Sequence, residues 1–136
     1  TFSDNFFPIS STVETVDLYP TLTALANLDR KTPKHNLDGK NLSPLLKDPN
    51  YLVKDHIYHS FIRQGNLGEA IRDKRYRMIR WTNLKVKKNV VYELYDYLKD
   101  PEERVNIANK NKDIVKKLLK KLNTYPPAKG LISMQY

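Results

Sequence analysis

The chain has 136 residues, of which 40% are hydrophobic and 29% are charged, so it is long enough for one modest folded core. No apolar run approaches the ~20 residues that span a bilayer, and the absence of cysteine excludes disulfides, thiolate metal sites and cysteine nucleophiles. The net charge of +9 favours polyanionic partners such as nucleic acid, anionic lipid or sulfated glycans.

The N-terminal region predicts a connector followed by one helix. The segment Thr1–Asp4 has neither an initiator methionine nor a signal sequence, so we expect a domain excised from a longer protein. A helix is expected over about residues 17–28, because Leu18, Leu22, Leu25 and Ala26 recur at helical spacing. Asp17 is the predicted N-cap, and Pro20 fits only near the start of a helix.

Residues 29–50 are predicted to form a loop with one short helical turn. In "NLSPLLKD", Ser43 is the predicted cap and Pro44 the first helical residue of a turn that reaches Leu46. The stretch ends the first predicted region, residues 1–50.

From His56 onwards the hydrophobic period changes to two, which is typical of strands. Four strands are predicted, over about residues 56–63, 68–73, 75–82 and 90–96. The second and third meet at Asp73–Lys74, a hairpin turn that lacks the favoured glycine. Their short connections indicate an antiparallel sheet with one covered face.

A C-terminal helix is predicted over about residues 111–123. Its apolar stripe contains Ile114, Val115, Leu118, Leu119 and Leu122, whereas lysines 112, 116, 117, 120 and 121 face outward. Such a helix can cover the sheet, so the second region, residues 51–136, has an α+β fold. The tail to Tyr136 is expected to be loosely attached.

The segment "ELYDYLKDPEERVNIAN", residues 93–109, is the strongest acidic cluster. Its spacing does not fit a calcium loop, because Pro101 stands where glycine is required. The adjacent Glu102 and Glu103 would diverge on a helix, so they do not form a catalytic pair. Asp100, Pro101, Glu102 and Glu103 instead match the cap and first turn of a helix. We therefore predict a structural turn from strand into helix.

The remaining motifs do not point to chemistry. His56 and His59 lie on opposite faces of a strand and His35 lies in a loop, so they cannot hold a metal together. The four glycines are scattered, which excludes a phosphate-binding loop. In "RDKRYRMIRW" the aromatic residues are split between two faces, and the stretch lacks a ribonucleoprotein signature. We expect Tyr76 and Trp81 to serve packing.

Four segments, in order, resemble sulfatases. "VETVDLYPTLTALANL" (13–28) resembles the helix that ends the sulfatase catalytic domain, and "LDGKNLSPLLKD" (37–48) resembles the loop that follows it. "ELYDYLKDPEERVNIA" (93–108) is similar to the C-terminal sulfatase signature. "SFIRQGNLGEAIRDKRYRMIRW" (60–81) is similar to strands of the iduronate-2-sulfatase branch.

The resemblance implies that residues 1–50 end a catalytic domain and that residues 51–136 form the C-terminal subdomain. The parent enzyme would hydrolyse sulfate esters, with calcium and a formylglycine made from Cys or Ser. The Cys-x-Pro-Ser-Arg motif and the Asp-Asp pair are absent here, so no catalytic or metal residue is expected in this chain, which should be inactive alone. The parent is expected to be periplasmic, secreted or lysosomal.

Two residues are candidates for substrate contacts at the pocket rim. Arg63 lies where the first strand ends, and an arginine fork suits sulfate or carboxylate groups; His59 is the second candidate. Expected partners are the N-terminal catalytic domain and a sulfated glycan, with no nucleic acid and no membrane. Excision should expose docking surfaces and favour self-association. Two alternatives remain: a free-standing basic module that binds polyanions or nucleic acid, and an interaction domain without a ligand.

Overall fold

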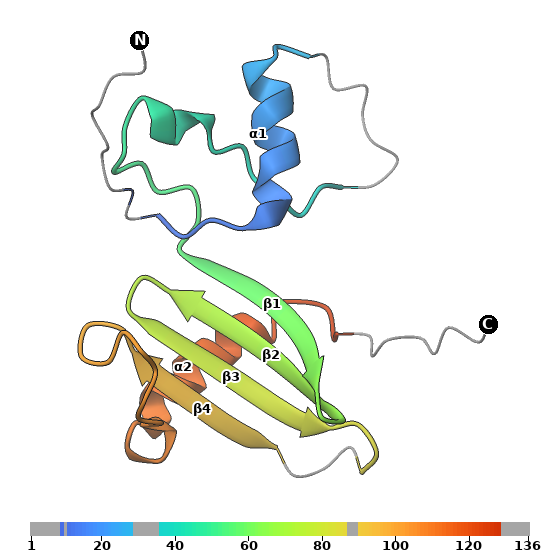
Figure 1. Ribbon diagram of the computed structural model, residues 1–136, viewed down its shortest axis with the longest axis vertical. Coiled ribbons are helices and arrows are strands. Elements are labelled where there is room, and N and C mark those ends of the chain that lie inside the picture. The colour runs from blue at the N-terminus through green and yellow to red at the C-terminus, as the bar shows by residue number, and fades with distance from the viewer. Residues whose placement is uncertain (1–8, 10, 29–35, 87–89, 129–136) are drawn as a thin grey trace, which may run out of the picture. The chain divides into compact units, whose positions relative to one another are not determined.

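The computed structural model describes residues 9, 11–28, 36–86 and 90–128 (Figure 1). The chain divides into two compact units, residues 1–57 and residues 58–136. Among the described residues, no helix has the length and apolar character needed to cross a membrane.

The first unit contains the helix α1 (Leu18–Leu25), which a 3-10 turn, Thr15–Asp17, precedes. The predicted helix is confirmed in place, but it ends three residues early, because Asn27 takes a left-handed conformation with a φ of 50°. A second 3-10 turn spans Ser43–Leu46, as expected. The prediction of Ser43 as its cap was wrong: Ser43 lies inside the turn, and its own N–H bonds to Oδ1 of Asn41 at 2.9 Å.

Asp17 stands before α1, but its carboxylate does not cap that helix. One oxygen accepts the N–H of Lys40 at 2.7 Å and lies 2.8 Å from Nζ of Lys54, and the other accepts the N–H of Glu14 at 2.8 Å. Burial by itself would raise the pKa of Asp17, but the hydrogen bonds from Lys54, Lys40 and Glu14 outweigh it and lower that pKa. The predicted cap is therefore a buried ionic link that ties three segments of the first unit together.

The apolar stripe of α1 is exposed. The side chains of Leu18, Leu22 and Leu25 are 55%, 62% and 55% exposed, whereas Pro20 is buried. The stripe has the spacing of a core-facing helix, yet no described residue covers it.

The sheet of the second unit has four strands, β1 (His56–Arg63), β2 (Asn66–Asp73), β3 (Tyr76–Asn83) and β4 (Val91–Asp96). The strand order is β1-β2-β3-β4, and the pairs β2–β3 and β3–β4 are antiparallel. The predicted α+β fold with a four-stranded antiparallel sheet is confirmed. At the turn between β2 and β3, Oδ1 of Asp73 accepts hydrogen bonds from the N–H groups of Arg75 and Tyr76. The aspartate side chain thus stabilises a turn that contains no glycine.

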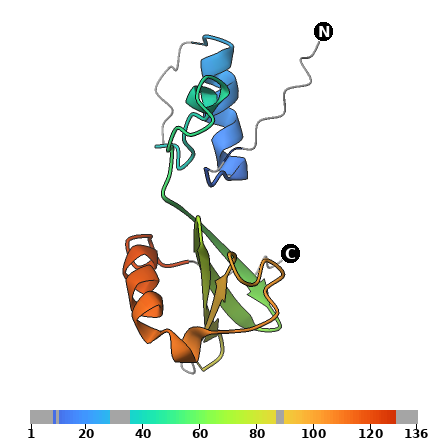
Figure 2. The same ribbon diagram turned by 90° about the vertical axis from the view of Figure 1, so that its left-hand side faces the viewer.

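One face of the sheet is covered by α2 (Lys112–Leu122), as Figure 2 shows. The predicted stripe of this helix packs on the row Ile71, Met78 and Leu94, one residue from each of three neighbouring strands. Tyr58 adds a ring stacked on Tyr125 at 4.5 Å. Within this unit the opposite face of the sheet carries no described helix, and we call it the open face.

The connection from β4 to α2 differs from the prediction. Residues 100–103 form a turn rather than the start of a helix, and Glu103 has a φ of 56°. Asp100 does cap backbone groups, because its Oδ2 accepts the N–H of Val105 at 2.8 Å, but the helix begins only at Lys112. The carboxylate of Glu103 is bonded to Arg77 and Tyr97. These contacts favour the turn over the helix that the local sequence predicts.

Candidate functional site

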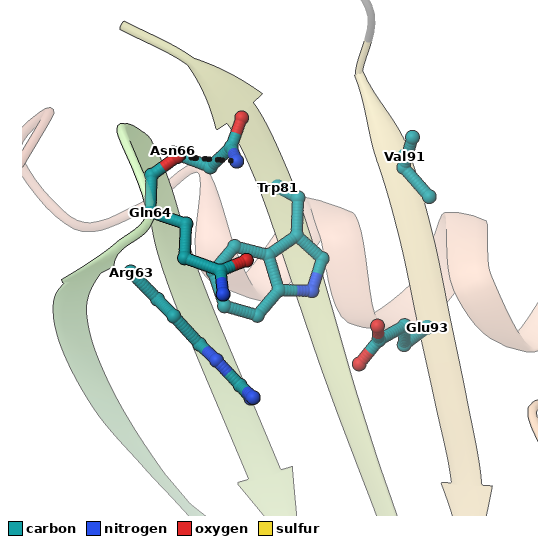
Figure 3. Close-up of a pocket in the computed structure, with 6 residues that line it drawn as sticks. All are labelled: Arg63, Gln64, Asn66, Trp81, Val91 and Glu93. Atoms are coloured by element: carbon teal, nitrogen blue, oxygen red, sulfur yellow. Dashed lines mark hydrogen bonds between the residues drawn. The ribbon is translucent and has the colours of Figure 1, made fainter.

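A hollow of about 320 Å³ lies on the open face, at the end of the sheet where β1 turns into β2. Figure 3 shows its lining side chains in front of the strands, with α2 behind them. Six residues from all four strands or their turns line it: Arg63, Gln64, Asn66, Trp81, Val91 and Glu93.

The turn from β1 to β2 positions one side of the hollow. It has two residues, Gln64 and Gly65, and both have positive φ, of 49° and 74°. This is the pattern of a type I′ hairpin turn, in which glycine is favoured at the second position. The turn is held by Asn66, whose Nδ2 donates to the carbonyl of Gln64 at 3.2 Å and whose Oδ1 accepts from Nδ2 of Asn83 at 3.2 Å.

A glycine leaves room for the indole of Trp81, which lines the hollow. Gly68 pairs with Trp81 across β2 and β3, and a Cβ at Gly68 would lie 2.8 Å from Cζ3 of Trp81 and 2.9 Å from Cζ of Phe61. The indole can therefore lie across the strand only because Gly68 has no side chain. The rings of Trp81 and Phe61 meet edge to face at 5.1 Å, which fixes the orientation of the indole.

The two charged residues of the hollow lie on opposite sides of the indole in Figure 3. Arg63 makes no hydrogen bond or ion pair with any described residue and is exposed. Glu93 is half-buried, and its Oε2 accepts from the hydroxyl of Tyr95 at 3.2 Å. Burial, together with the neighbouring Glu93, raises the pKa of Tyr95, so this hydroxyl stays protonated as a donor. The hollow thus has a cationic side and an anionic side.

Further along the open face, an ionic latch closes the loop after β4. Nη1 of Arg77 bonds to both oxygens of Glu103, the hydroxyl of Tyr97 donates to the same carboxylate, and Arg72 lies 4.1 Å from the centre of the Tyr97 ring. Burial alone would raise the pKa of Glu103, but the bonds from Tyr97 and Arg77 outweigh it and lower that pKa. Because Arg77 and Glu103 are paired with each other, we assign them a structural role rather than a role in ligand binding.

The two predicted contact residues have different positions. Arg63 lines the hollow, whereas His59 lies four residues earlier on β1 and does not line it. The ring of His59 stacks on Phe61 at 5.5 Å. Sequence reasoning assigned Trp81 to packing alone and missed Gln64, Asn66 and Glu93. The Gln-Gly pair between two alternating segments was the available signal for a hairpin end at this point.

The carboxylates of the acidic segment make hydrogen bonds and ion pairs with other groups of the protein. Among the residues that the structure describes, no group of three His, Asp or Glu side chains could hold a metal ion. Asp96 instead forms a two-pronged ion pair with Arg75, at 3.1 and 2.8 Å, and that hydrogen-bonded pair lowers the pKa of Asp96.

Several solved structures are similar to this chain. The chain is similar to a candidate sulfatase from Bacteroides thetaiotaomicron, with 28% identity, a TM-score of 0.63, and coverage of 80% of this chain and 23% of that one. It is similar to Ps i-CgsB, with 27% identity, a TM-score of 0.64, and coverage of 84% and 24%. It shares the fold of BT4656, solved with its substrate D-glucosamine-2-N,6-O-disulfate, at 21% identity, a TM-score of 0.64, and coverage of 79% and 22%.

The chain spans about a quarter of the length of these solved structures. The comparison with curated protein sequences gives no match. The sequence profile of one family, described as N-sulphoglucosamine sulphohydrolase, C-terminal, matches residues 7–126 and so covers most of the chain. The chain therefore belongs to this family of C-terminal sulfatase domains.

Proposed function

We propose that this chain is the C-terminal part of a sulfatase that hydrolyses sulfate esters of glycans. The observation that carries the proposal is the family match over residues 7–126, supported by the likeness to solved structures that are about four times longer. The reaction chemistry would then lie in a catalytic domain outside these 136 residues, and the chain would complete that enzyme structurally.

The exposed stripe of α1 supports a catalytic domain as the partner. Leu18, Leu22 and Leu25 have the spacing of a helix that packs on another surface, and they are exposed within this chain. The catalytic domain that precedes the C-terminal subdomain in sulfatases is the occupant that we propose.

Calcium and formylglycine, which the sulfatase resemblance implies, would supply metal binding and the nucleophile. The described residues do not fit a calcium site, because they contain no cluster of three ligands, and the chain has no cysteine and no Cys- or Ser-x-Pro-Ser-Arg motif. We therefore assign both groups to the catalytic domain and derive no step through them here.

The finer assignment concerns substrate and branch. Arg63 would contact the sulfated substrate at the rim of the pocket, and His59 is the second candidate for such a contact. The sequence of residues 60–81 favours the iduronate-2-sulfatase branch, which stays a prediction. A similar solved structure supports a sugar as the substrate, because Ps i-CgsB was solved in complex with k-i-k-neocarrahexaose. The same proposal implies a periplasmic, secreted or lysosomal parent.

The coding sequence ahead of Thr1 and an activity assay test this proposal. We expect that sequence to encode Cys- or Ser-x-Pro-Ser-Arg and an Asp-Asp pair, and we expect the purified 136-residue chain to leave 4-nitrophenyl sulfate intact with or without calcium. A coding sequence without those motifs, or calcium-dependent hydrolysis by the chain alone, would contradict the proposal.

A second candidate function is a free-standing module that binds polyanions. Lys112, Lys116, Lys117 and Lys120 are exposed on α2, and this face favours the idea. It predicts binding to heparin that weakens steeply with salt and that the double substitution Lys116→Gln and Lys117→Gln reduces. Weak binding without that salt dependence would exclude it.

A further inference from the structure

We infer that the hollow beside Trp81 is a binding subsite for one sulfated sugar ring, oriented with its anionic group toward Arg63 and its hydroxyls toward Glu93. The inference rests on the proposed sulfatase function but names residues and an orientation that this function does not require.

The shape of the hollow suits a single ring. Its volume of about 320 Å³ lies at the lower end of the ~300–1,000 Å³ typical of small-molecule sites. One wall is the indole of Trp81, which Gly68 and Phe61 hold in a fixed orientation before any ligand arrives. A rigid aromatic surface bordered by a few polar groups is the usual composition of such a site, and the C–H groups of a sugar ring can pack on it.

The polar groups around the indole suit hydroxyls and one anion. Gln64 offers an amide donor and acceptor, Glu93 offers a carboxylate acceptor, and Arg63 offers a planar fork of donors. The guanidinium of Arg63 has no described partner, so it can bind sulfate or carboxylate without breaking an ion pair.

The two opposite charges give the subsite a direction. A sulfate near Glu93 would meet a carboxylate of like charge in a partly enclosed site, which is unfavourable, whereas a sugar hydroxyl can donate to it. The sulfate must therefore lie on the Arg63 side. A sugar with a second sulfate on the opposite side of the ring should bind less tightly.

One donor in the hollow is not satisfied by the protein. Nε1 of Trp81 is buried and has no hydrogen-bond partner among the described residues. It lies on the Glu93 side of the indole in Figure 3. Buried donors normally find an acceptor, so an oxygen atom of a ligand is a natural partner for this group.

Trp81 is the only tryptophan of the chain, so its fluorescence reports on the subsite directly. The purified 136-residue chain is titrated with N-acetylglucosamine 6-sulfate, with unsulfated N-acetylglucosamine, with inorganic sulfate and with a single-stranded DNA oligonucleotide. We expect a saturable change in Trp81 emission with the sulfated sugar, a response at least tenfold weaker with the unsulfated sugar, and no change with sulfate alone.

Substitutions at the two charged residues test the orientation. Arg63→Gln should reduce the affinity for the sulfated sugar at least fivefold, whereas Arg104→Gln, which removes the same charge from an exposed site outside the hollow, should leave it unchanged. Glu93→Gln should improve the binding of a disulfated sugar relative to a monosulfated one. Circular dichroism confirms that each variant is folded.

The outcomes separate this inference from the proposed function. A response to DNA but not to sugar, or equal losses from Arg63→Gln and Arg104→Gln, would overturn the subsite. If the chain binds the sulfated sugar but the coding sequence ahead of Thr1 lacks the sulfatase motifs, the subsite is supported and the sulfatase proposal is overturned. Hydrolysis by a full enzyme whose KM does not respond to Arg63→Gln would overturn only the subsite.

Discussion

The two units of the molecule differ in how they bury their apolar side chains. Residues 58–136 enclose an apolar core of their own between the sheet and α2, with Ile71, Met78, Leu94, Leu118 and Leu122 almost fully buried. In residues 1–57 the leucines of α1 are exposed, few apolar side chains are buried, and the buried Asp17 forms an ion pair with Lys54. The second unit therefore has an apolar core of its own, whereas the first leaves the apolar stripe of α1 uncovered by any described residue.

This difference predicts where a deletion of apolar atoms matters most. Leu118→Ala should lower the free energy of unfolding by about 2–5 kcal/mol, because Leu118 is 1% exposed at the centre of the core. Leu22→Ala, the same chemical change on the exposed stripe of α1, should stay within about 0.5 kcal/mol. Urea unfolding followed by circular dichroism measures both. Equal effects would show that the stripe of α1 is covered.

The charged link of the first unit should be its most sensitive point. Asp17→Asn keeps the shape but removes the buried one of the two carboxylates that pair with Lys54 and leaves only Glu14, at an expected cost of about 1–3 kcal/mol. Amide hydrogen exchange should accelerate in α1 and remain unchanged in α2. Faster exchange in both units would mean that they unfold together.

The two units should also differ in their stability toward acid. The pKa of Asp17 in the folded chain lies below its ordinary value of 3.8, so the stability that its ionised form provides is present above pH 3.8 and is lost as the pH falls below it. We expect NMR amide signals of α1 to lose dispersion as the pH falls below 3.8, before those of α2, whose core is apolar. A single transition shared by both units would contradict this order.

The latch on the open face should contribute less. Glu103→Gln keeps the side-chain shape but weakens the bonds to Arg77 and Tyr97, at an expected cost of about 0.5–1.5 kcal/mol. Because the folded-state pKa of Glu103 is lowered, the contribution should be fully present above the ordinary pKa of 4.5 and should be lost as the pH falls from there through the lower folded-state pKa. The variant and the original chain should therefore have the same stability in strong acid, as urea unfolding at low pH can show.

The exposed stripe also predicts weak self-association of the isolated chain. Leu22→Lys places a charge on the stripe and should shift the chain toward monomer in sedimentation velocity runs at high concentration. Lys47→Gln, at an exposed site off α1, serves as the control. If the original chain is strictly monomeric at high concentration, the stripe of α1 does not mediate self-association and this prediction is wrong.

The sequence predicted the elements better than their ends. β1 was predicted over its full length, because His56 to Arg63 alternates without interruption. The helix start at Asp100 was wrong, since Asp-Pro-Glu-Glu suits a tight turn equally well and Arg77, distant in sequence, holds Glu103 in the left-handed region. Tertiary contacts of this kind are invisible to local propensity.

The candidate site was only partly predictable for a similar reason. Arg63 followed from the chemistry of arginine at a strand end. The role of Trp81 depends on its pairing with Gly68, and that of Glu93 on the register of β4 against β3, where it pairs with Ile79. Strand register is set by long-range pairing, so the sequence alone could not bring these side chains together.

A complementation assay tests most directly our proposal that this chain completes a sulfatase. The reading frame ahead of Thr1 is expressed separately, mixed with the 136-residue chain, and assayed for hydrolysis of 4-nitrophenyl sulfate. We predict that neither part is active alone and that the mixture is active, with less recovery when Leu22→Lys disrupts the stripe of α1. Full activity of the separate part, unchanged when the chain is added, would contradict the account.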